Sequence, residues 1–409
     1  MTKTIKLAVV AALALGATSA FATNGALMIG QGAKSRSMGG VGIATAFGAQ
    51  SAIANPANIS STKDTEATLA VTVFTPDVSF KSGYAGATGD YKKSGADLSV
   101  IPEIYYSKRL SDKLVIGLAV AGTAGMGVDY DNDIVGLGAT SAGTDRMKTA
   151  LSILKVVVPV SYSTGGLTLG AAGVLQYGTL EMSHGVSTAF RSSGFLDNGQ
   201  ASDVGYGLEL GATYTTGGLT LGAVYKSKIA MTYNNTLSDS IDSFSSTITS
   251  GDNLDQPEER GVGISYTMGA NTIAADYKNI AWGDASGYSD FGWEDQDVYS
   301  IGYEHATDSW VLRAGYNYAK SPISDLGVGG TDYQGSVKNF FNLNGFPGVV
   351  ESHYTLGAGY NVTDSMSLNA AVVYAPEVTN TYATTTNLGG EVSVKHSQTG
   401  VTMAATYTY

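Results

Sequence analysis

Apolar and polar side chains alternate with a period of two residues through most of the chain after residue 65. Between Trp310 and Tyr318, the apolar even positions alternate with Val311, Arg313, Gly315 and Asn317. Residues that alternate in this way lie on opposite faces of a β-strand. The apolar faces carry Tyr or Trp near their ends, and charged groups such as Arg313 lie on the other face. This arrangement is typical of a lipid-facing band with aromatic girdles.

The connections between these predicted strands are alternately short and long. Short turns are expected at 111–113, 164–166, 216–218, 268–271, 306–309 and 362–365. Longer polar segments lie near 81–98, 124–148, 181–202, 234–257, 283–296, 322–350 and 377–392. Thirteen connections indicate about fourteen strands, an even number that places both ends of the barrel on the periplasmic side. The predicted fold class is therefore all-β, a transmembrane antiparallel barrel.

The first 22 residues have the features of a secretory signal peptide. Lys3 and Lys6 precede an apolar run over 7–15, and small residues lead to Ala20-Phe21-Ala22. The run is too short to span a bilayer as a helix, and the Ala-x-Ala ending suits signal peptidase. We therefore predict cleavage after Ala22 and export to the outer membrane.

Composition excludes several classes of protein. Without its two signal-peptide lysines the chain has 21 basic and 35 acidic residues, which makes nucleic acid an unsuitable partner. Cysteine is absent, so disulfides, thiolate metal sites and a cysteine nucleophile are excluded. No later stretch approaches ~20 apolar residues, and 53 Gly and 25 Tyr fit a β protein. A closed barrel remains the way to cross a membrane, because lipid cannot satisfy an open sheet edge.

Residues 24–61 differ from the rest of the chain, being rich in Gly, Ala and Ser with few charges. Such a segment cannot bury much core by itself, and its low charge favours packing inside the barrel over a disordered leader. The predicted organisation is a signal peptide over 1–22, a plug or hatch over 23–65, and a barrel over 66–409.

One set of sequence blocks lies at 30–42, at the Asn55-Pro56-Ala57 triplet, and at 276–282, 292–297, 312–323, 351–357 and 374–376. Together these blocks resemble the FadL-type family of outer-membrane fatty-acid and hydrocarbon transporters, which includes TodX-like proteins. The resemblance implies a fourteen-stranded barrel closed by an N-terminal hatch. It also implies passive uptake of hydrophobic molecules, which leave sideways at a kink in the third strand. No cofactor, nucleotide or metal is expected.

Residues that match this scheme are candidates for its working parts. Asn55, Pro56 and Ala57 form the predicted hatch motif, with an ordinary surface turn as the alternative. Gly122, Gly125 and Gly127 are candidates for the strand kink and lateral gate, because glycine permits a bulge, although they could equally begin a loop. Substrate-binding candidates are Phe190, Phe195, Phe244, Arg313, Lys320, Phe340 and Phe341. The alternatives are that the aromatic residues pack against one another and that the cations pair with facing acids.

No catalytic constellation is assembled in the sequence. The four histidines, His184, His305, His353 and His396, fall in separate predicted elements. The protein is therefore predicted not to be an enzyme, with a hydrophilic porin as the main alternative and an outer-membrane lipid-modifying enzyme as the weaker one. Expected partners are a hydrophobic small molecule, outer-membrane lipid and lipopolysaccharide, and the barrel-assembly machinery, which would read the final strand ending at Tyr409. A monomer is expected.

Overall fold

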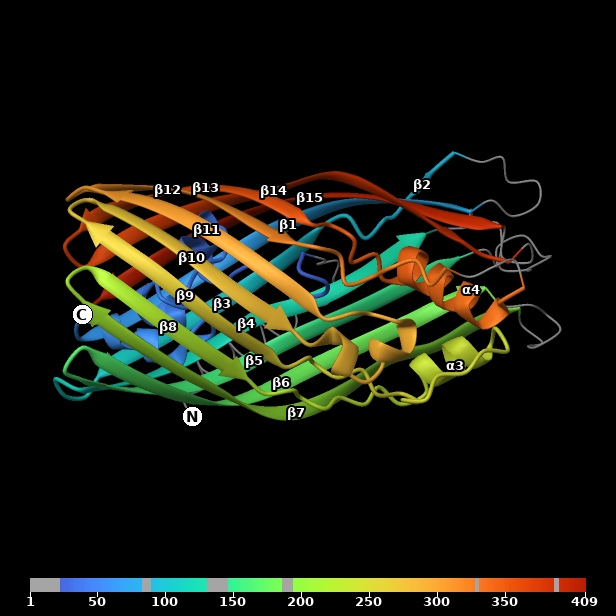
Figure 1. Ribbon diagram of the computed structural model, residues 1–409, viewed down its shortest axis with the longest axis horizontal. Helices are drawn as coiled ribbons and strands as arrows, with labels where there is room; N and C mark the ends of the chain where they lie inside the picture. The colour runs from blue at the N-terminus through green and yellow to red at the C-terminus, as the bar shows by residue number, and fades with distance from the viewer. Residues whose placement is uncertain (1–22, 83–89, 131–145, 186–193, 328–330, 386–389) are drawn as a thin grey trace.

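The computed structural model describes residues 23–82, 90–130, 146–185, 194–327, 331–385 and 390–409, which form a closed barrel (Figure 1). The predicted signal peptide lies outside these residues. Every strand pairs antiparallel with its neighbour in sequence, and β15 pairs with β1 to close the sheet. The two-residue strand β2, Lys92–Lys93, pairs only with β1. Fourteen long strands remain, so the predicted barrel is confirmed.

The long strands are β1 Thr65–Ser82, β3 Ser99–Arg109, β4 Leu114–Tyr130, β5 Met147–Thr164, β6 Leu167–Gly185, β7 Phe195–Thr216, β8 Leu219–Lys226, β9 Glu259–Met268, β10 Asn271–Ile280, β11 Gln296–Ala306, β12 Trp310–Ala319, β13 Ser352–Thr363, β14 Met366–Ala383 and β15 Glu391–Thr408. All six predicted short turns connect consecutive strands at one end of the barrel. Gly165, Gly166, Gly217 and Gly218 have positive φ, as two-residue hairpin turns require.

Several strands extend beyond the limits that the sequence pattern predicts. The expected loop at 124–148 begins as strand, because β4 continues to Tyr130 and β5 starts at Met147. The expected loops at 181–202 and 377–392 likewise contain the ends of β6, β7, β14 and β15. Above the lipid both faces of a strand can be polar, so hydropathy stops alternating while the backbone pairing continues.

The outer face of the barrel carries the apolar rows that the period of two predicts. Leu69, Val71 and Val73 of β1 are exposed, as are Tyr354 and Leu356 of β13. These side chains would be unfavourable in water and are suited to hydrocarbon. The part of the chain described by the structure contains no helix that is long and apolar enough to cross a membrane.

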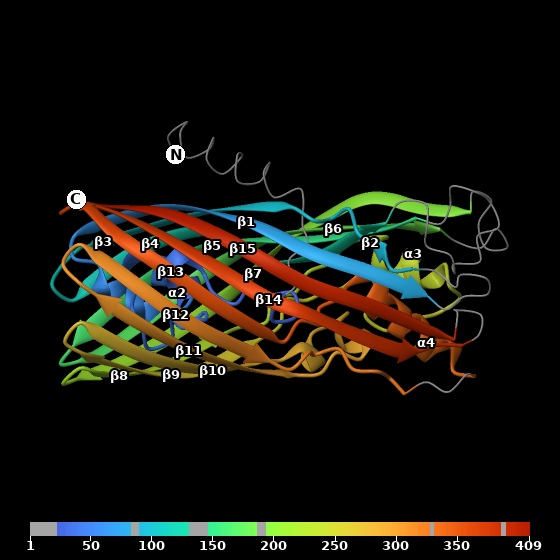
Figure 2. The same cartoon turned by 90° about the horizontal axis from the view of Figure 1, so that it is seen from above.

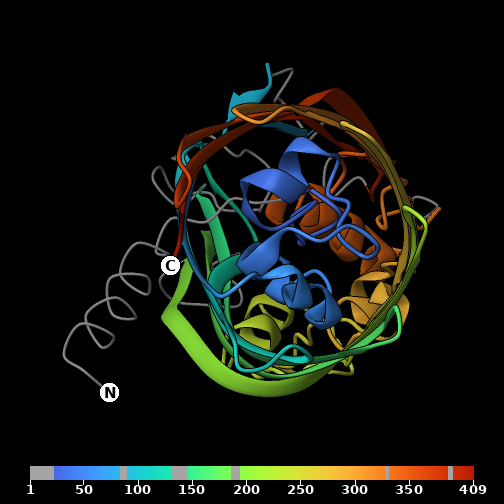
Figure 3. The same ribbon diagram turned by 90° about the vertical axis from the view of Figure 1, so that its left-hand side faces the viewer.

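Residues 23–64 run inside the barrel, where they form α2 Gly32–Ser37 and the 3-10 helices η1 Gly48–Ala52 and η2 Pro56–Ser61 (Figures 2 and 3). We call this stretch the N-terminal segment. At the end with long loops lie α3 Leu237–Asp242, η3 Trp282–Asp284, η4 Ser289–Phe291, α4 Tyr333–Phe340 and the π-helical turn η5 Phe341–Gly345. Long loops mark the extracellular end of such barrels.

Candidate transport pathway

An aromatic cluster fills the extracellular part of the lumen. Three predicted substrate-binding residues meet there, with ring centroids of Phe244 5.9 Å from Phe340 and 5.2 Å from Phe341. His184 packs 5.3 Å from Phe244 and 5.8 Å from Phe341, and Phe80 stands edge-on to Phe340. Edge-to-face packing of this kind stabilises aromatic pairs. The three predicted residues come from two loops that are distant in sequence and pack against one another, as the alternative stated above expects.

A second aromatic group, which sequence reasoning missed, adjoins the N-terminal segment. Trp282, Tyr288 and Trp293 contact one another with centroids 4.5–5.1 Å apart. A Cβ built on Gly25 would lie 2.8 Å from the Trp282 ring, so only glycine fits there. Burial raises the pKa of Tyr288, which keeps its hydroxyl neutral. The two tryptophans in one otherwise polar loop between β10 and β11 could have revealed this group from the sequence.

The remaining substrate-binding candidates do not lie with the aromatic cluster. Phe195 lies beneath Arg146, whose guanidinium carbon is 5.4 Å from the ring centroid, and Lys320 is exposed. Arg313 is paired with Glu304 at 2.6 Å and donates to Asn369. It lines a cavity on the periplasmic side of the N-terminal segment, as the alternative of pairing with a facing acid predicted. Phe190 falls outside the described residues.

The barrel wall contains a window between β3 and β4. Pairing of these strands stops at Glu103 and Ala121, although β4 continues for nine more residues. Above this point the edge of β4 pairs instead with the N-terminal segment. Met28 N donates to Thr123 O at 3.2 Å, and Gly125 N donates to Ala26 O at 3.0 Å. The gap in the wall is therefore filled by residues 26–28.

The predicted kink residues Gly122, Gly125 and Gly127 lie along this window, within β4 and not in a loop. A bulge interrupts the pairing of β4 with β5 between Gly122 and Ala124. A Cβ on Gly122 would lie 2.7 Å from the Ile101 side chain. Pro102, which has no N–H to donate, stands on β3 where the pairing ends. This proline was a signal in the sequence that could have located the window.

The upper limit of the window is set by a return of the chain toward β4. Gly95 N donates to Asp129 O at 2.6 Å, and Ser94 N donates to Val78 O of β1 at 2.8 Å. Met28, Phe74 and Ile101 form a small buried apolar cluster beside the opening. The window is therefore bounded above and below by hydrogen bonds, with an apolar cluster beside it and buried Glu103 at its lower end.

The predicted hatch motif is held against the wall by hydrogen bonds of Asn55 and by close contact with glycines on the facing strands. Asn55 caps η2 by accepting from Ala57 N at 3.0 Å and donates to Ile43 O at 2.7 Å. Gly170 and Gly211 are directly paired on β6 and β7. A Cβ on Gly170 would lie 2.2 Å from Ala57 N, and one on Gly211 would lie 1.9 Å from the side-chain Oδ1 of Asn55. The glycine pair thus forms a seat for the Asn-Pro-Ala triplet.

Two further cross-strand glycine pairs support the N-terminal segment in the same way. They are Gly222 with Gly263 and Gly302 with Gly315. The carbonyl of Ile43 approaches the first pair, and Met38 with Gly39 approaches the second. Between them, Asp276 accepts from Gly42 N at 2.7 Å and Ile43 N at 2.9 Å.

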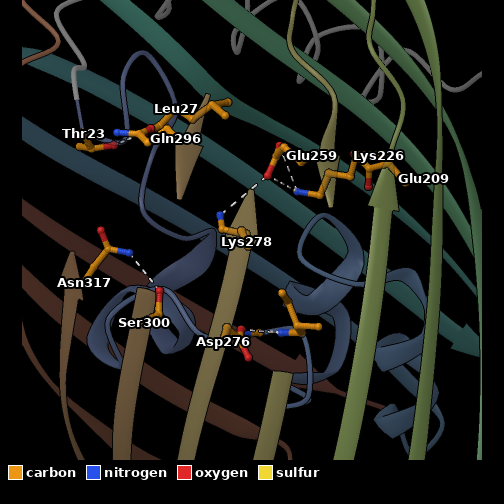
Figure 4. A network of polar contacts seen from close by, with 12 residues as sticks. Thr23, Leu27, Glu209, Lys226, Glu259, Asp276, Lys278, Gln296, Ser300 and Asn317 are labelled. Atoms are coloured by element: carbon orange, nitrogen blue, oxygen red, sulfur yellow. Dashed lines mark hydrogen bonds and ion pairs between the residues drawn. The ribbon is translucent and has the colours of Figure 1, made fainter. Parts of the chain in front are cut away.

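A row of buried or half-buried charges of alternating sign begins on β5, where Lys155 pairs with Ala121 at the lower end of the window, and continues along the lumen wall. Lys155, Glu209, Lys226, Glu259 and Lys278 come from β5, β7, β8, β9 and β10. The ion pairs Lys155–Glu209, Lys226–Glu259 and Lys278–Glu259 measure 3.9, 3.5 and 3.8 Å. Figure 4 shows two lysines converging on Glu259 from neighbouring strands. We call this row the charge ladder; sequence reasoning did not find it, because its members are far apart in the chain.

The periplasmic part of the lumen is polar. A cavity of about 700 Å³ opens below the N-terminal segment. Its lining includes Thr168, Thr213, Thr215, Thr220, Ser265, Thr267, Thr272 and Thr408 together with Lys34, Glu66, Glu304, Arg313 and Asp364. An apolar molecule would lose favourable contacts on entering this chamber.

The family model for outer membrane protein transport proteins (OMPP1/FadL/TodX) matches residues 8–329. The chain belongs to this family. Members of the FadL/TodX family are outer-membrane transporters and not enzymes, so the predicted location and the absence of enzymatic function are confirmed, and the lipid-modifying alternative is wrong. No curated protein sequence matches the chain.

Solved structures of this FadL/TodX family share the fold. A Pseudomonas aeruginosa FadL homologue has a TM-score of 0.70 at 16% identity, over 94% of this chain and 99% of that one. The Pseudomonas putida toluene transporter TodX has a TM-score of 0.70 at 19% identity, over 93% and 99% of the two chains. The Ralstonia pickettii toluene transporter TbuX has a TM-score of 0.64 at 19% identity, over 93% and 98%.

Proposed function

We propose that this FadL/TodX-family protein takes up hydrophobic small molecules, such as hydrocarbons or long-chain fatty acids, and releases them sideways through the window between β3 and β4. The observation that carries this proposal is an interrupted wall that has the apolar cluster of Met28, Phe74 and Ile101 beside it. An apolar molecule gains by passing directly into lipid and avoids a wet chamber.

The two sides of the lumen differ in a way that would direct cargo toward the window. On the β1, β3 and β4 side, buried apolar residues such as Phe74, Ile101, Met126 and Val128 reach from the aromatic cluster to the opening. The charge ladder begins on β5 beside the lower end of the window and runs along the wall to β10. An apolar molecule cannot replace the partners of buried charges, so it is favoured along Phe74, Ile101, Met126 and Val128.

The N-terminal segment is positioned to act as a hatch on this route. Its residues 26–28 fill the window, and Gly25 touches the Trp282 ring of the second aromatic group. Cargo that entered among these rings would press on the same residues that seal the wall. Displacement of residues 24–28 would then free the edge of β4 without unfolding any barrel strand.

The aromatic cluster is the proposed entrance site. Phe244 and Phe340 belong to loops at the extracellular end, and Phe341 begins the π-helical turn beside them. A rigid, edge-to-face group of rings offers a flat apolar molecule contacts like those that the rings make with each other. The toluene transporters among the similar structures are consistent with such cargo.

Uptake by cells that lack their own transporter tests this proposal. Cells that produce the protein should accumulate labelled toluene or labelled oleate faster than cells with an empty vector, and labelled maltose at the same rate. Maltose distinguishes the porin alternative, which predicts uptake of the sugar through an open lumen. Equal uptake of both hydrophobic compounds by the two cell lines would refute the proposal.

A further inference from the structure

We infer that the buried ion pair between Arg36 and Glu103 positions residues 26–28 in the wall window. The inference rests on the proposed function in that the window is the exit. The effect of the ion pair on residues 26–28 can, however, be measured without any cargo. Arg36 belongs to α2 of the N-terminal segment, and Glu103 belongs to β3.

Arg36 connects three strands of the wall from inside the lumen. Only 1% of its side chain is exposed. Its Nη1 pairs with Glu103 and donates to Thr72 Oγ1 of β1 at 2.5 Å and to Thr402 Oγ1 of β15 at 3.3 Å. The guanidinium therefore spans the seam where β15 meets β1 as well as the strand beside the window.

Glu103 occupies the point where β3 and β4 separate. It faces Ala121, the last residue of β4 that pairs with β3. Its second carboxylate oxygen accepts from Gly32 N at 2.8 Å and from the Tyr105 hydroxyl at 2.6 Å. The Glu103 carboxylate thus binds the backbone at the start of α2 and the side chain of Arg36, at the point where β3 and β4 separate.

The same guanidinium reaches the residues that fill the window. Arg36 Nη2 lies 3.3 Å from the sulfur of Met28. The backbone N–H of Met28 donates to Thr123 O on the free edge of β4. A continuous set of contacts therefore leads from Glu103 through Arg36 and Met28 to the edge of β4.

Loss of one charge would disturb this set of contacts more than loss of both. A buried ion pair gains little over a well-packed neutral pair, but a single buried charge without its partner is strongly unfavourable. With Glu103 neutral, the Arg36 guanidinium would draw in water or move toward another acceptor. Met28 would then lose its neighbour, and residues 26–28 would leave the edge of β4 more often.

Thiol labelling of the purified protein in detergent measures this opening directly. Leu27 is 5% exposed and the chain has no cysteine, so Leu27→Cys introduces one protected thiol. Adding Glu103→Gln should raise the rate of its modification by a water-soluble maleimide about tenfold or more, because the unpaired charge favours the displaced state. An unchanged rate in a folded barrel would overturn the inference.

Glu304→Gln is the matched control. Glu304 pairs with Arg313 at 2.6 Å in the same lumen, on the periplasmic side of the N-terminal segment. This variant loses a luminal ion pair whose acid is partly exposed and which does not contact residues 26–28, so labelling of Cys at position 27 should stay at the rate of the parent. Equal acceleration by Glu103→Gln and Glu304→Gln would show general loosening of the lumen and would also overturn the inference.

A neutral pair separates charge from packing. The double substitution Arg36→Met with Glu103→Gln removes both charges and keeps an acceptor for Gly32 N and the Tyr105 hydroxyl, so labelling should be slower than in Glu103→Gln alone. A rate equal to that of Glu103→Gln would contradict the inference. Heat-modifiable migration in gels reports whether each barrel has folded. If Glu103→Gln does not assemble, Arg36→Lys replaces it, because lysine keeps the charge but cannot contact Glu103, Thr72 and Met28 together. Lys at position 36 should also accelerate labelling, and a parent-like rate would overturn the inference.

Discussion

Aromatic side chains from separate segments meet at the extracellular end of the lumen, and each ring packs against at least one other ring. Phe341 is the most connected, with Phe244, Phe291, Phe340 and His184 around it. Its ring is fully buried. A single residue thus links a loop helix, a strand and a π-helical turn at the proposed entrance site.

Phe341→Ala should weaken binding of toluene about tenfold, because it removes ring contacts that contribute ~0.5–1.5 kcal/mol each. The cluster should also become looser, as large-to-small changes in a core leave a cavity. Fluorescence of the nearby tryptophans during titration with toluene measures the binding. Phe195→Ala, at a ring outside the cluster, should bind toluene as the parent does. Equal affinity of parent and Phe341→Ala would remove the cluster from the pathway.

The N-terminal segment contacts the barrel strands closely at positions where the strands carry glycine. Three cross-strand glycine pairs on β6 with β7, β8 with β9, and β11 with β12 let the backbone of the segment approach the wall. The triplet Asn55-Pro56-Ala57 occupies the first of these seats. A glycine on the inner face is therefore a binding surface here and not merely a flexible position.

Gly170→Val should unseat the triplet, since any Cβ at this position collides with the backbone at Ala57. Single-channel recordings in planar bilayers should show larger or more frequent ion conductance as the segment leaves the lumen. Gly173→Val is the control on the same strand, because a Cβ there meets nothing within 4 Å. A silent Gly170→Val channel with normal folding would contradict the proposed seat.

The sequence predicts the strands and turns, which depend on local pattern, and misses the contacts between residues that meet across the lumen. Turns such as Gly165-Gly166 and the order of strands follow from alternation and turn chemistry. The charge ladder and the Arg36–Glu103 pair join residues from distant strands, so no local spacing reveals them. Arg313 was on the correct inward face, but its height in the barrel, below the N-terminal segment, could not be read from the strand period.

The lining of the lumen differs between its extracellular and periplasmic parts and around the barrel wall. An aromatic extracellular part lies above the N-terminal segment, and a threonine-rich chamber lies below it. The charge ladder runs from β5, beside the window, to β10, and the interrupted wall with its apolar cluster lies between β3 and β4. Fourteen strands and outer-membrane location were predictable from the sequence, whereas this asymmetry arises only when the barrel closes through β1 and β15.

A reversible disulfide lock tests whether cargo leaves through the window that residues 26–28 fill. Leu27 and Ala124 are bridge partners, so Leu27→Cys with Ala124→Cys can form a disulfide across the seal in a chain that has no other cysteine. With the disulfide formed, uptake of labelled toluene should fall to the empty-vector rate, and reduction should restore it. Unchanged uptake with the disulfide fully formed would contradict lateral exit through this window.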